Sequence, residues 1–235
     1  MPPGRYMLRF SFESSLSNSL QGLYKSTYLD RTTGEKRYIV TSYLHATAAR
    51  MVFPCLDEPS FKANFTITII HNRNMTAMSN MPVETSTNYS ETKLATTFQE
   101  SHKMVTYLVA VVVCDLVHIA GKTSRGTPVR VYARKDVIGD AEYALDTAIQ
   151  VLEYYEQLFN IPYPLPKLDN IAVPDFQLNA MENWGLITYR ESRLLYNPNT
   201  SSVSNQFETA EVVAHELAHM WFGNLVTMKW WNDVW

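Results

Sequence analysis

The sequence predicts an α+β protein, with a β-sheet domain in the first half and a domain of mixed helices and strands in the second. Short segments rich in β-branched and aromatic residues, divided by turn residues, fill the first half. After residue 140 the apolar spacing changes to that of a helix. With 46% hydrophobic residues among 235, the chain can fill two cores. We place the boundary at the soft stretch 121–126, which gives domains of residues 1–121 and 122–235.

The first domain is predicted to consist of strands. Leu8, Phe10 and Phe12 alternate with other residues at the spacing of a half-buried strand. Later segments have a similar composition and are separated by turn signals such as Gly34 and Pro59. The expected strands are residues 5–13, 22–28, 37–43, 64–71 and 104–114.

The second domain is predicted to open with a helix. Asp140 can cap this helix, and apolar residues follow at i, i+3 and i+4 spacing as far as Phe159. A proline-rich stretch, 162–166, then stops it. Two short segments, 171–174 and 185–189, are predicted to be strands.

A second helix is predicted after the loop at 197–204, which is rich in Ser and Asn. Asn205 with Glu208 three residues later resembles a capping box, so the helix should start there. Gly223 is a typical stop signal. We therefore expect a helix from Asn205 to about Gly223.

This second helix carries the sequence His-Glu-Leu-Ala-His at 215–219. Histidines at positions i and i+4 lie one turn apart on the same face, where both imidazoles can reach one tetrahedral Zn²⁺. Glu216 lies beside them and can polarise a metal-bound water. The pattern is typical of metallohydrolases, and it predicts His215 and His219 as metal ligands and Glu216 as the catalytic residue.

A catalytic zinc site of this kind uses three protein ligands and leaves one position for water. The remaining histidines all lie in the predicted β domain, and we expect each to be a strand or surface residue rather than the third ligand. They are His45, His71, His102 and His118.

Charge and hydropathy exclude several classes of partner. The formal net charge is -3 and no cluster of Lys and Arg stands out, so we expect no nucleic-acid partner. The longest apolar run, near 107–119, is interrupted by Asp115 and is too short for a membrane-spanning helix. Residues 1–12 lack the apolar core of a secretory signal peptide.

The cysteines and the glycosylation sequons give weak evidence about the cellular compartment. Two cysteines, Cys55 and Cys114, make no disulfide framework and leave the redox environment open. Asn-X-Ser/Thr sequons, which are used only in the secretory pathway, occur at four positions. These positions are Asn64, Asn74, Asn88 and Asn199.

Two longer motifs occur in a fixed order. Asn-Ala-Met-Glu-Asn-Trp-Gly-Leu occupies 179–186, and the metal-ligand sequence continues through 227, with Trp-Trp-Asn-Asp at 230–233. Together they resemble the aminopeptidase N family of gluzincin peptidases. Further matches, which extend the resemblance over nearly the whole chain, lie at 49–63, 79–82 and 106–109. Segments 161–166 and 188–192 are most similar to the oxytocinase and endoplasmic-reticulum aminopeptidase branch.

The resemblance implies a fold and a set of site residues. The first domain would be a saddle-like β-sheet, and the second the first part of a thermolysin-like α/β catalytic domain. The cofactor would be Zn²⁺, held by His215 and His219, with Glu216 as general base. Glu182 would anchor the free α-amine of a peptide, and the backbone before it would lie along the bound substrate. The implied substrate-binding residues are Glu182, Asn179, Ala180, Met181 and Tyr43.

The implied activity is the release of single N-terminal amino acids from peptides by attack of a metal-activated water. A carboxylate at Glu182 would pair with the cationic N-terminus and place the first peptide bond over the metal. The implied partners are therefore peptides with a free N-terminus. The resemblance leaves open whether the protein forms a homodimer.

Three residues depart from the family pattern. The family usually has Gly where this chain has Asn179, and a side chain there could narrow a subsite. Many members have Gln at the position of Tyr43, and Glu or Gln at the position of His45. We expect Tyr43 to change the pocket for the first residue of the substrate.

The resemblance places other parts of the enzyme outside these residues. The family's third zinc ligand is a Glu in a stretch that would continue past Trp235, and its transition-state Tyr and helical C-terminal domain lie further on. We expect the N-terminal edge to be truncated too. Residues 1–235 alone should thus bind zinc poorly and be inactive. Family members are commonly held by an N-terminal membrane anchor, with the catalytic part extracellular or in the endoplasmic reticulum lumen.

Two alternatives stay open. One is a non-catalytic truncated or inactive homologue that binds peptides or a partner chain, for which the absence of the Glu ligand would be diagnostic. The other is a zinc hydrolase for another substrate class, such as an epoxide hydrolase or an endopeptidase. Acetylation of the substrate's α-amine would distinguish an aminopeptidase from these.

Overall fold

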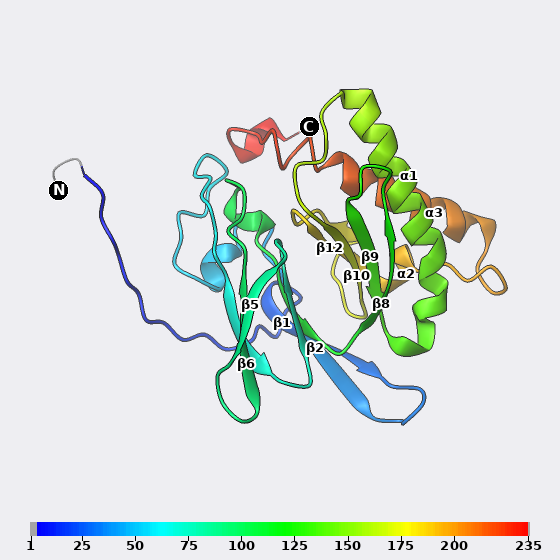
Figure 1. Ribbon diagram of the computed structural model, residues 1–235, viewed down its shortest axis with the longest axis horizontal. Helices are drawn as coiled ribbons and strands as arrows, with labels where there is room; N and C mark the ends of the chain where they lie inside the picture. Colours follow the sequence, from blue (N-terminus) through cyan, green and yellow to red (C-terminus); the bar gives the residue numbers. More distant parts are fainter. Residues whose placement is uncertain (1–3, 235) are drawn as a thin grey trace.

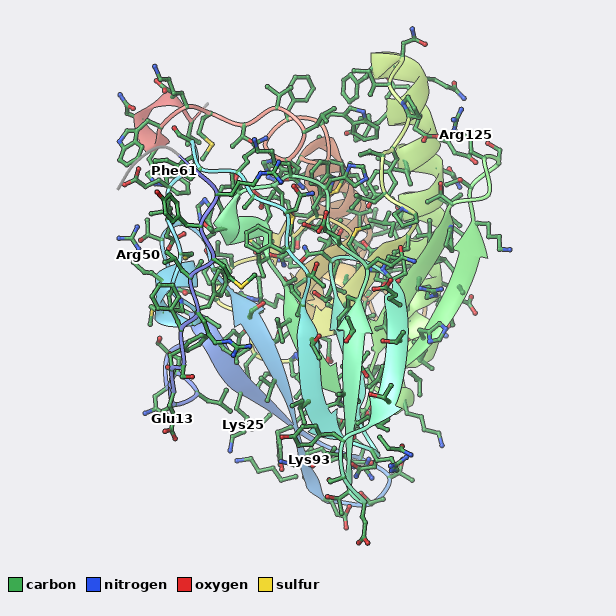
Figure 2. The ribbon with its side chains drawn as sticks, turned by 60° about the vertical axis from the view of Figure 1, so that its left-hand side comes forward. Glu13, Lys25, Arg50, Phe61, Lys93 and Arg125 are labelled. Carbon is green, nitrogen blue, oxygen red and sulfur yellow. The ribbon has the colours of Figure 1, made fainter. Side chains whose placement is uncertain are left out.

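The computed structural model describes residues 4–234, with two antiparallel sheets in the first half of the chain and a mixed sheet flanked by helices in the second (Figure 1). The first half holds a sheet in the order β1-β2-β7-β4 and another in the order β3-β6-β5. Figure 2 shows Lys93 at one end of the second of these sheets. The strands are β1 Gly22–Leu29, β2 Lys36–Tyr43, β3 Thr68–Asn72, β4 Thr76–Ser79, β5 Val83–Asn88, β6 Lys93–Phe98 and β7 Val111–Cys114.

The predicted strands of the first half are only partly confirmed. Strands β1 and β2 pair along their full predicted length. The expected strand at 5–13 is wrong: these residues form an extended arm with exposed apolar side chains, because no strand among residues 4–234 pairs with them. Of 64–71 only the end is a strand, β3. The stretch 104–114 is broken by a buried 3₁₀ turn and reaches strand form only at β7.

The second half contains a five-stranded sheet in the order β11-β12-β10-β9-β8. Strands β9, β10 and β12 are parallel, and β8 and β11 pair antiparallel at the edges. The predicted strands 171–174 and 185–189 are confirmed as β10 and β12. The strands are β8 Val117–Lys122, β9 Pro128–Ala133, β10 Leu168–Val173, β11 Ala180–Met181 and β12 Leu186–Arg190.

The chain passes from one sheet to the other between β7 and β8, at Asp115 and Leu116. The predicted division put residues up to 121 in the first domain, yet β8 hydrogen-bonds to β9 in the second sheet. The soft stretch 121–126 is the turn of the β8–β9 hairpin, where Gly126 has a φ of +89° and its N–H donates to the carbonyl of Thr123. Glycine is suited to this turn because the left-handed conformation costs it little.

The first predicted helix is α1, Glu142–Phe159, and it ends where expected. Asn160 closes it in the left-handed conformation with a φ of 52°. The prediction that Asp140 caps the helix is wrong. A 3₁₀ helix, Lys135–Ala141, precedes α1, and the Asp140 carboxylate instead accepts a hydrogen bond from the side chain of Asn197.

The second predicted helix is α3, Val203–Ala218, and both predicted ends are corrected. Ser202 is the cap: its hydroxyl accepts from the Asn205 N–H, and the Asn205 side chain accepts from the Ser202 N–H. Asn205 is thus the inner partner of the capping box, and Glu208 pairs with Arg193. The helix ends at Ala218, five residues before Gly223, and His219 is its C-cap residue. The remaining helices are α2 Glu191–Leu194 and the 3₁₀ turns Ala49–Met51, Thr106–Leu108 and Trp231–Asp233.

The helices cover the second sheet and hold the site. Helix α1 packs on β8 and β9 and on α3, as Figure 1 shows. Val213 and Leu217 of α3 are fully buried. No helix within residues 4–234 has the length and apolarity needed to cross a membrane.

Gly185 lies where the two halves of the chain meet, with a φ of +84°. A Cβ atom there would collide with the backbone oxygen of Asn80 and approach Leu165 Cδ1 to 2.9 Å. Gly185→Ala is therefore expected to destabilise the fold by about 2–4 kcal/mol, the sum of backbone strain and overpacking. Gly126→Ala is the control, because its backbone is equally left-handed but nothing lies within 4 Å of the added Cβ. It should cost about 1 kcal/mol. Equal shifts of the thermal unfolding midpoint for the two variants would contradict this account.

Buried tyrosines should make the fold sensitive to alkali. Burial raises the pKa of Tyr132 to about 12, and burial also raises the pKa values of Tyr24, Tyr107, Tyr163 and Tyr189. A raised pKa means that the folded state holds protons that the unfolded state loses above about pH 10. Stability should thus be constant with respect to these groups below about pH 10 and fall above it. In a pH titration, complete ionisation of the fourteen tyrosines should require unfolding; the full tyrosinate absorbance with the fold intact would contradict the prediction.

Candidate functional site

Helix α3 brings His215 and His219 together as predicted. The two residues lie one turn apart, and their Nε2 atoms are 3.1 Å from each other. Two nitrogen ligands of a tetrahedral zinc ion, each at about 2.0–2.1 Å from the metal, would lie about 3.3 Å apart. The separation of the two histidine nitrogens therefore fits a shared zinc ion.

The orientation of the His219 ring is fixed by the chain that follows the helix. Its Nδ1 lies 2.9 Å from the carbonyl oxygen of Phe222, which can only accept, so Nδ1 carries the proton. The Nε2 atom is then left with its lone pair facing His215, as a metal ligand requires. Gly223 has a φ of +123°, and a Cβ there would lie 3.1 Å from His219 Nδ1. Glycine thus suits the position where the chain turns against the ring.

The described residues supply two metal-ligand candidates at this point and not three. No group of three or more His, Cys, Asp or Glu side chains within residues 4–234 could hold a metal ion. The donor set that is present fits zinc in kind and spacing, since imidazole nitrogens are common zinc ligands.

Glu216 is buried beside the histidines. Glu216 is only 4% exposed, and its Oε2 atom has no hydrogen-bond partner among the described residues. Burial, and then the neighbouring Glu182, raise the pKa of Glu216 well above its usual range. A buried carboxylate oxygen without a protein partner is free to interact with water or substrate.

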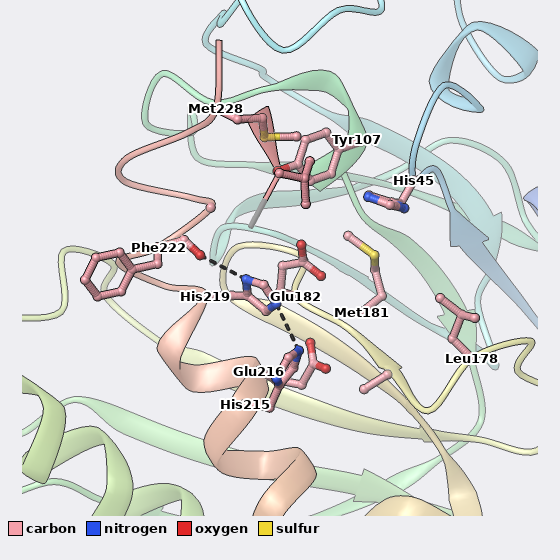
Figure 3. Close-up of a pocket in the computed structure, with 13 residues that line it drawn as sticks. His45, Tyr107, Leu178, Met181, Glu182, His215, Glu216, His219, Phe222 and Met228 are labelled. Carbon is pink, nitrogen blue, oxygen red and sulfur yellow. Dashed lines mark hydrogen bonds between the residues drawn. The ribbon is translucent and has the colours of Figure 1, made fainter. Parts of the chain in front are cut away.

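Glu182 lies in the turn between β11 and β12 and faces the histidines across a cavity (Figure 3). The residue is half-buried, and the described residues give its carboxylate neither a salt bridge nor a hydrogen bond. Its backbone carbonyl accepts a 2.9 Å hydrogen bond from the Asn224 side chain. The backbone at Glu182 is therefore held while its charge stays available.

The cavity has a volume of about 240 Å³ and combines charged and apolar walls. The predicted residues Ala180, Met181 and Glu182 line it, together with His215, Glu216 and His219.

Two predicted substrate-binding residues do not line the cavity. Asn179 is exposed, and its carbonyl accepts from the N–H of Arg190. Tyr43 is buried, and its ring lies 5.6 Å from that of Phe176. Burial raises the pKa of Tyr43, and Glu182 adds to this effect. Their effects on substrate specificity stay predictions.

The cavity is also lined by residues that the sequence analysis did not select as site residues. His45 lies there with its ring 5.3 Å from Tyr107 and 5.5 Å from Trp231, edge to face in both cases. Burial lowers the pKa of His45, while Glu182 acts in the opposite direction. Spacing along the chain could not reveal this aromatic group, because its three members come from distant segments. The only available signal was the departure from the family pattern at His45.

Comparisons with known proteins match both halves of the chain. Residues 1–108 match the peptidase M1 N-terminal domain, and residues 143–235 match the peptidase family M1 domain. The chain is 49% identical to endoplasmic reticulum aminopeptidase 2 of Bos taurus over 98% of its own length and 24% of that protein. It is 50% identical to endoplasmic reticulum aminopeptidase 1 of Homo sapiens, again over 98% of its length and 24% of the relative. Glutamyl aminopeptidase of Sus scrofa is 47% identical over 99% of the chain and 24% of that protein. The chain thus spans about a quarter of the length of these relatives.

Proposed function

Because this chain belongs to peptidase family M1, we propose that it forms part of a zinc aminopeptidase that releases single amino acids from the free N-termini of peptides. One observation carries the proposal: two converging imidazole nitrogens, a buried carboxylate and a second, unpaired carboxylate border one cavity. The relatives named aminopeptidases support the same reaction class.

Glu182 determines where the peptide is cut. Its half-buried carboxylate pairs with the cationic α-amine, which places the first peptide bond beside the His215 and His219 nitrogens. Because the free α-amine occurs only at the start of a peptide, the bond placed beside the histidines is the first one. Cleavage therefore stops after a single residue.

Glu216 transfers the protons of the reaction. Its unpartnered Oε2 accepts a proton from the attacking water and gives it to the leaving amine as the peptide bond breaks. Zinc held by the two histidines and a third ligand would supply Lewis acidity that polarises the scissile carbonyl. The relatives extend well beyond the matched region, and we propose that the third ligand comes from outside the described residues.

Zinc binding and cleavage can be tested together on the full-length protein. Equilibrium dialysis should give about one zinc per chain, and His219→Ala should lose it. Mass spectrometry of a digested peptide should show successive loss of one N-terminal residue. Internal cuts would favour an endopeptidase, and a protein that binds peptides without zinc and without cleavage would favour the non-catalytic alternative. Residues 1–235 alone should bind zinc weakly and be inactive, because two ligand candidates meet within the described residues 4–234.

We also propose that the protein resides in the secretory pathway, with its catalytic part outside the cytosol. The names of two of the relatives refer to the endoplasmic reticulum, and all four sequon asparagines are exposed. Asn64 differs from the other three because its side-chain amide donates a 2.7 Å hydrogen bond to the Ser101 carbonyl. Removal of N-linked glycans should lower the mass of the secreted or lumenal protein; an unchanged mass would contradict the glycoprotein assignment.

A further inference from the structure

The turn that carries Glu182 is held by side chains from three separate parts of the chain. Asn224, beyond the metal-ligand helix, donates to the Glu182 carbonyl at 2.9 Å. Asn80, from the first domain, donates to the Trp184 carbonyl at 2.9 Å. Lys167, the residue before β10, donates to the Gly185 carbonyl at 2.6 Å. Three carbonyls within four consecutive residues are thus fixed from different directions.

Both the nitrogen and the oxygen of the Asn80 side-chain amide are hydrogen-bonded. Its Nδ2 donates to the carbonyls of Leu108, at 2.7 Å, and Trp184, and its Oδ1 accepts from the Ala110 N–H at 2.9 Å. The residue is 2% exposed. One amide therefore ties the Glu182 turn to two points of the first domain, in a buried place where unpaired groups are costly.

Lys167 makes a matching connection from the second domain. Its ammonium donates to the carbonyls of Ser79, at 3.0 Å, and Gly185, and pairs with the Asp169 carboxylate at 2.8 Å. Three acceptors satisfy all three of its protons. Burial lowers the pKa of Lys167, while Asp169 opposes the shift and favours the charged form.

The packing leaves this turn little freedom to move. Gly185 lies so close to the Asn80 carbonyl that a Cβ would not fit, which brings the first-domain strand end directly against the turn. Asn183 is fully buried and donates to the Thr188 hydroxyl at 3.1 Å. In contrast, the Glu182 carboxylate itself has no partner among residues 4–234. The backbone is rigidly held while the functional group is left free.

We propose that Asn80 and Lys167 are positioning residues that fix the distance between the Glu182 carboxylate and the histidine pair, so that the first domain helps to set where a peptide is cut. The inference rests on the proposed role of Glu182 as the amine anchor. Because misplacement by about 1 Å can reduce catalysis about 100-fold, a turn held by buried hydrogen bonds from both domains provides a way to keep this spacing.

The test compares Asn80→Ala with Ser79→Ala in the full-length protein. Ser79 is the adjacent buried residue, and its hydroxyl donates to the Ala110 carbonyl at 2.7 Å without touching the Glu182 turn. Each change thus removes buried hydrogen bonding at the same place in the fold. Asn80→Ala should raise KM for a free-amine peptide by about 10-fold or more and leave bound zinc unchanged, whereas Ser79→Ala should leave KM unchanged. Equal KM values for the two variants, or loss of zinc in Asn80→Ala, would overturn the proposal.

Two further variants keep the test decisive. Lys167→Met keeps the aliphatic stem and removes the bonds donated to the Ser79 and Gly185 carbonyls, while Asp169 keeps its ion pair with Arg130, so this variant should reproduce the KM effect if Asn80→Ala fails to fold. In a Glu182→Gln background, Asn80→Ala should have no additional effect on the preference for free over acetylated amines. An additional effect there would overturn the positioning role alone. If Glu182→Gln itself leaves that preference intact, both the proposed function and this inference fail.

Discussion

Glu216→Gln is expected to lower kcat by about 10²- to 10⁴-fold, the range that a general base or acid contributes. Glutamine has nearly the same shape, so it should fit the buried position of Glu216, which is 4% exposed. It cannot accept the proton of the attacking water and pass it to the leaving amine. Because no described residue pairs with Glu216 Oε2, the substitution breaks no hydrogen bond at that atom.

The control for this prediction is Glu211→Gln, on the same helix. Glu211 is exposed and does not line the cavity, so its substitution should change kcat less than about twofold. Steady-state kinetics, zinc content and thermal unfolding should be measured for both variants. A Glu216→Gln enzyme that retains more than a tenth of normal kcat with zinc bound would contradict the assigned role.

Glu182→Gln is expected to reduce kcat/KM for peptides with a free N-terminus by about 30- to 1,000-fold, equivalent to about 2–4 kcal/mol. The substitution removes one partner of a partly buried charge pair and leaves the peptide ammonium without its counterion. The backbone carbonyl of Glu182, which Asn224 holds, is unaffected by this change. The loss should therefore come from the charge and not from movement of the turn.

An acetylated form of the same peptide provides the internal control for Glu182→Gln. It carries no N-terminal charge, so its low turnover should be the same in the two enzymes. The preference for free over acetylated peptide should consequently shrink in the variant. A parallel loss for both peptides would assign Glu182 to the fold of the site rather than to recognition of the amine.

The proximity of the two helix histidines could be predicted from the sequence because its geometry is local. Residues at i and i+4 of a helix meet wherever that helix lies, and His215 and His219 do so. The ends of the helix were less predictable. In the structure Ser202 and Asn205 form the capping box, and Glu208 pairs with Arg193, a contact that depends on tertiary structure.

The parts of the structure that depend on distant partners could not be predicted from residue patterns. Residues 5–13 have the alternation of a strand, but a strand forms only where another one pairs with it. The stretch 121–126 has the composition of a linker and also of a hairpin turn, and only the pairing of β8 with β9 distinguishes them. Likewise, His45, Tyr107 and Trp231 meet only in the folded chain.

Turnover of one peptide with a free and with an acetylated N-terminus, by the full-length zinc-loaded protein, tests the central claim most directly. The account predicts release of the first residue from the free peptide and almost no cleavage of the acetylated one, because the Glu182 carboxylate then has no cation to bind. Comparable cleavage of both peptides would contradict the claim that this site recognises the N-terminal amine.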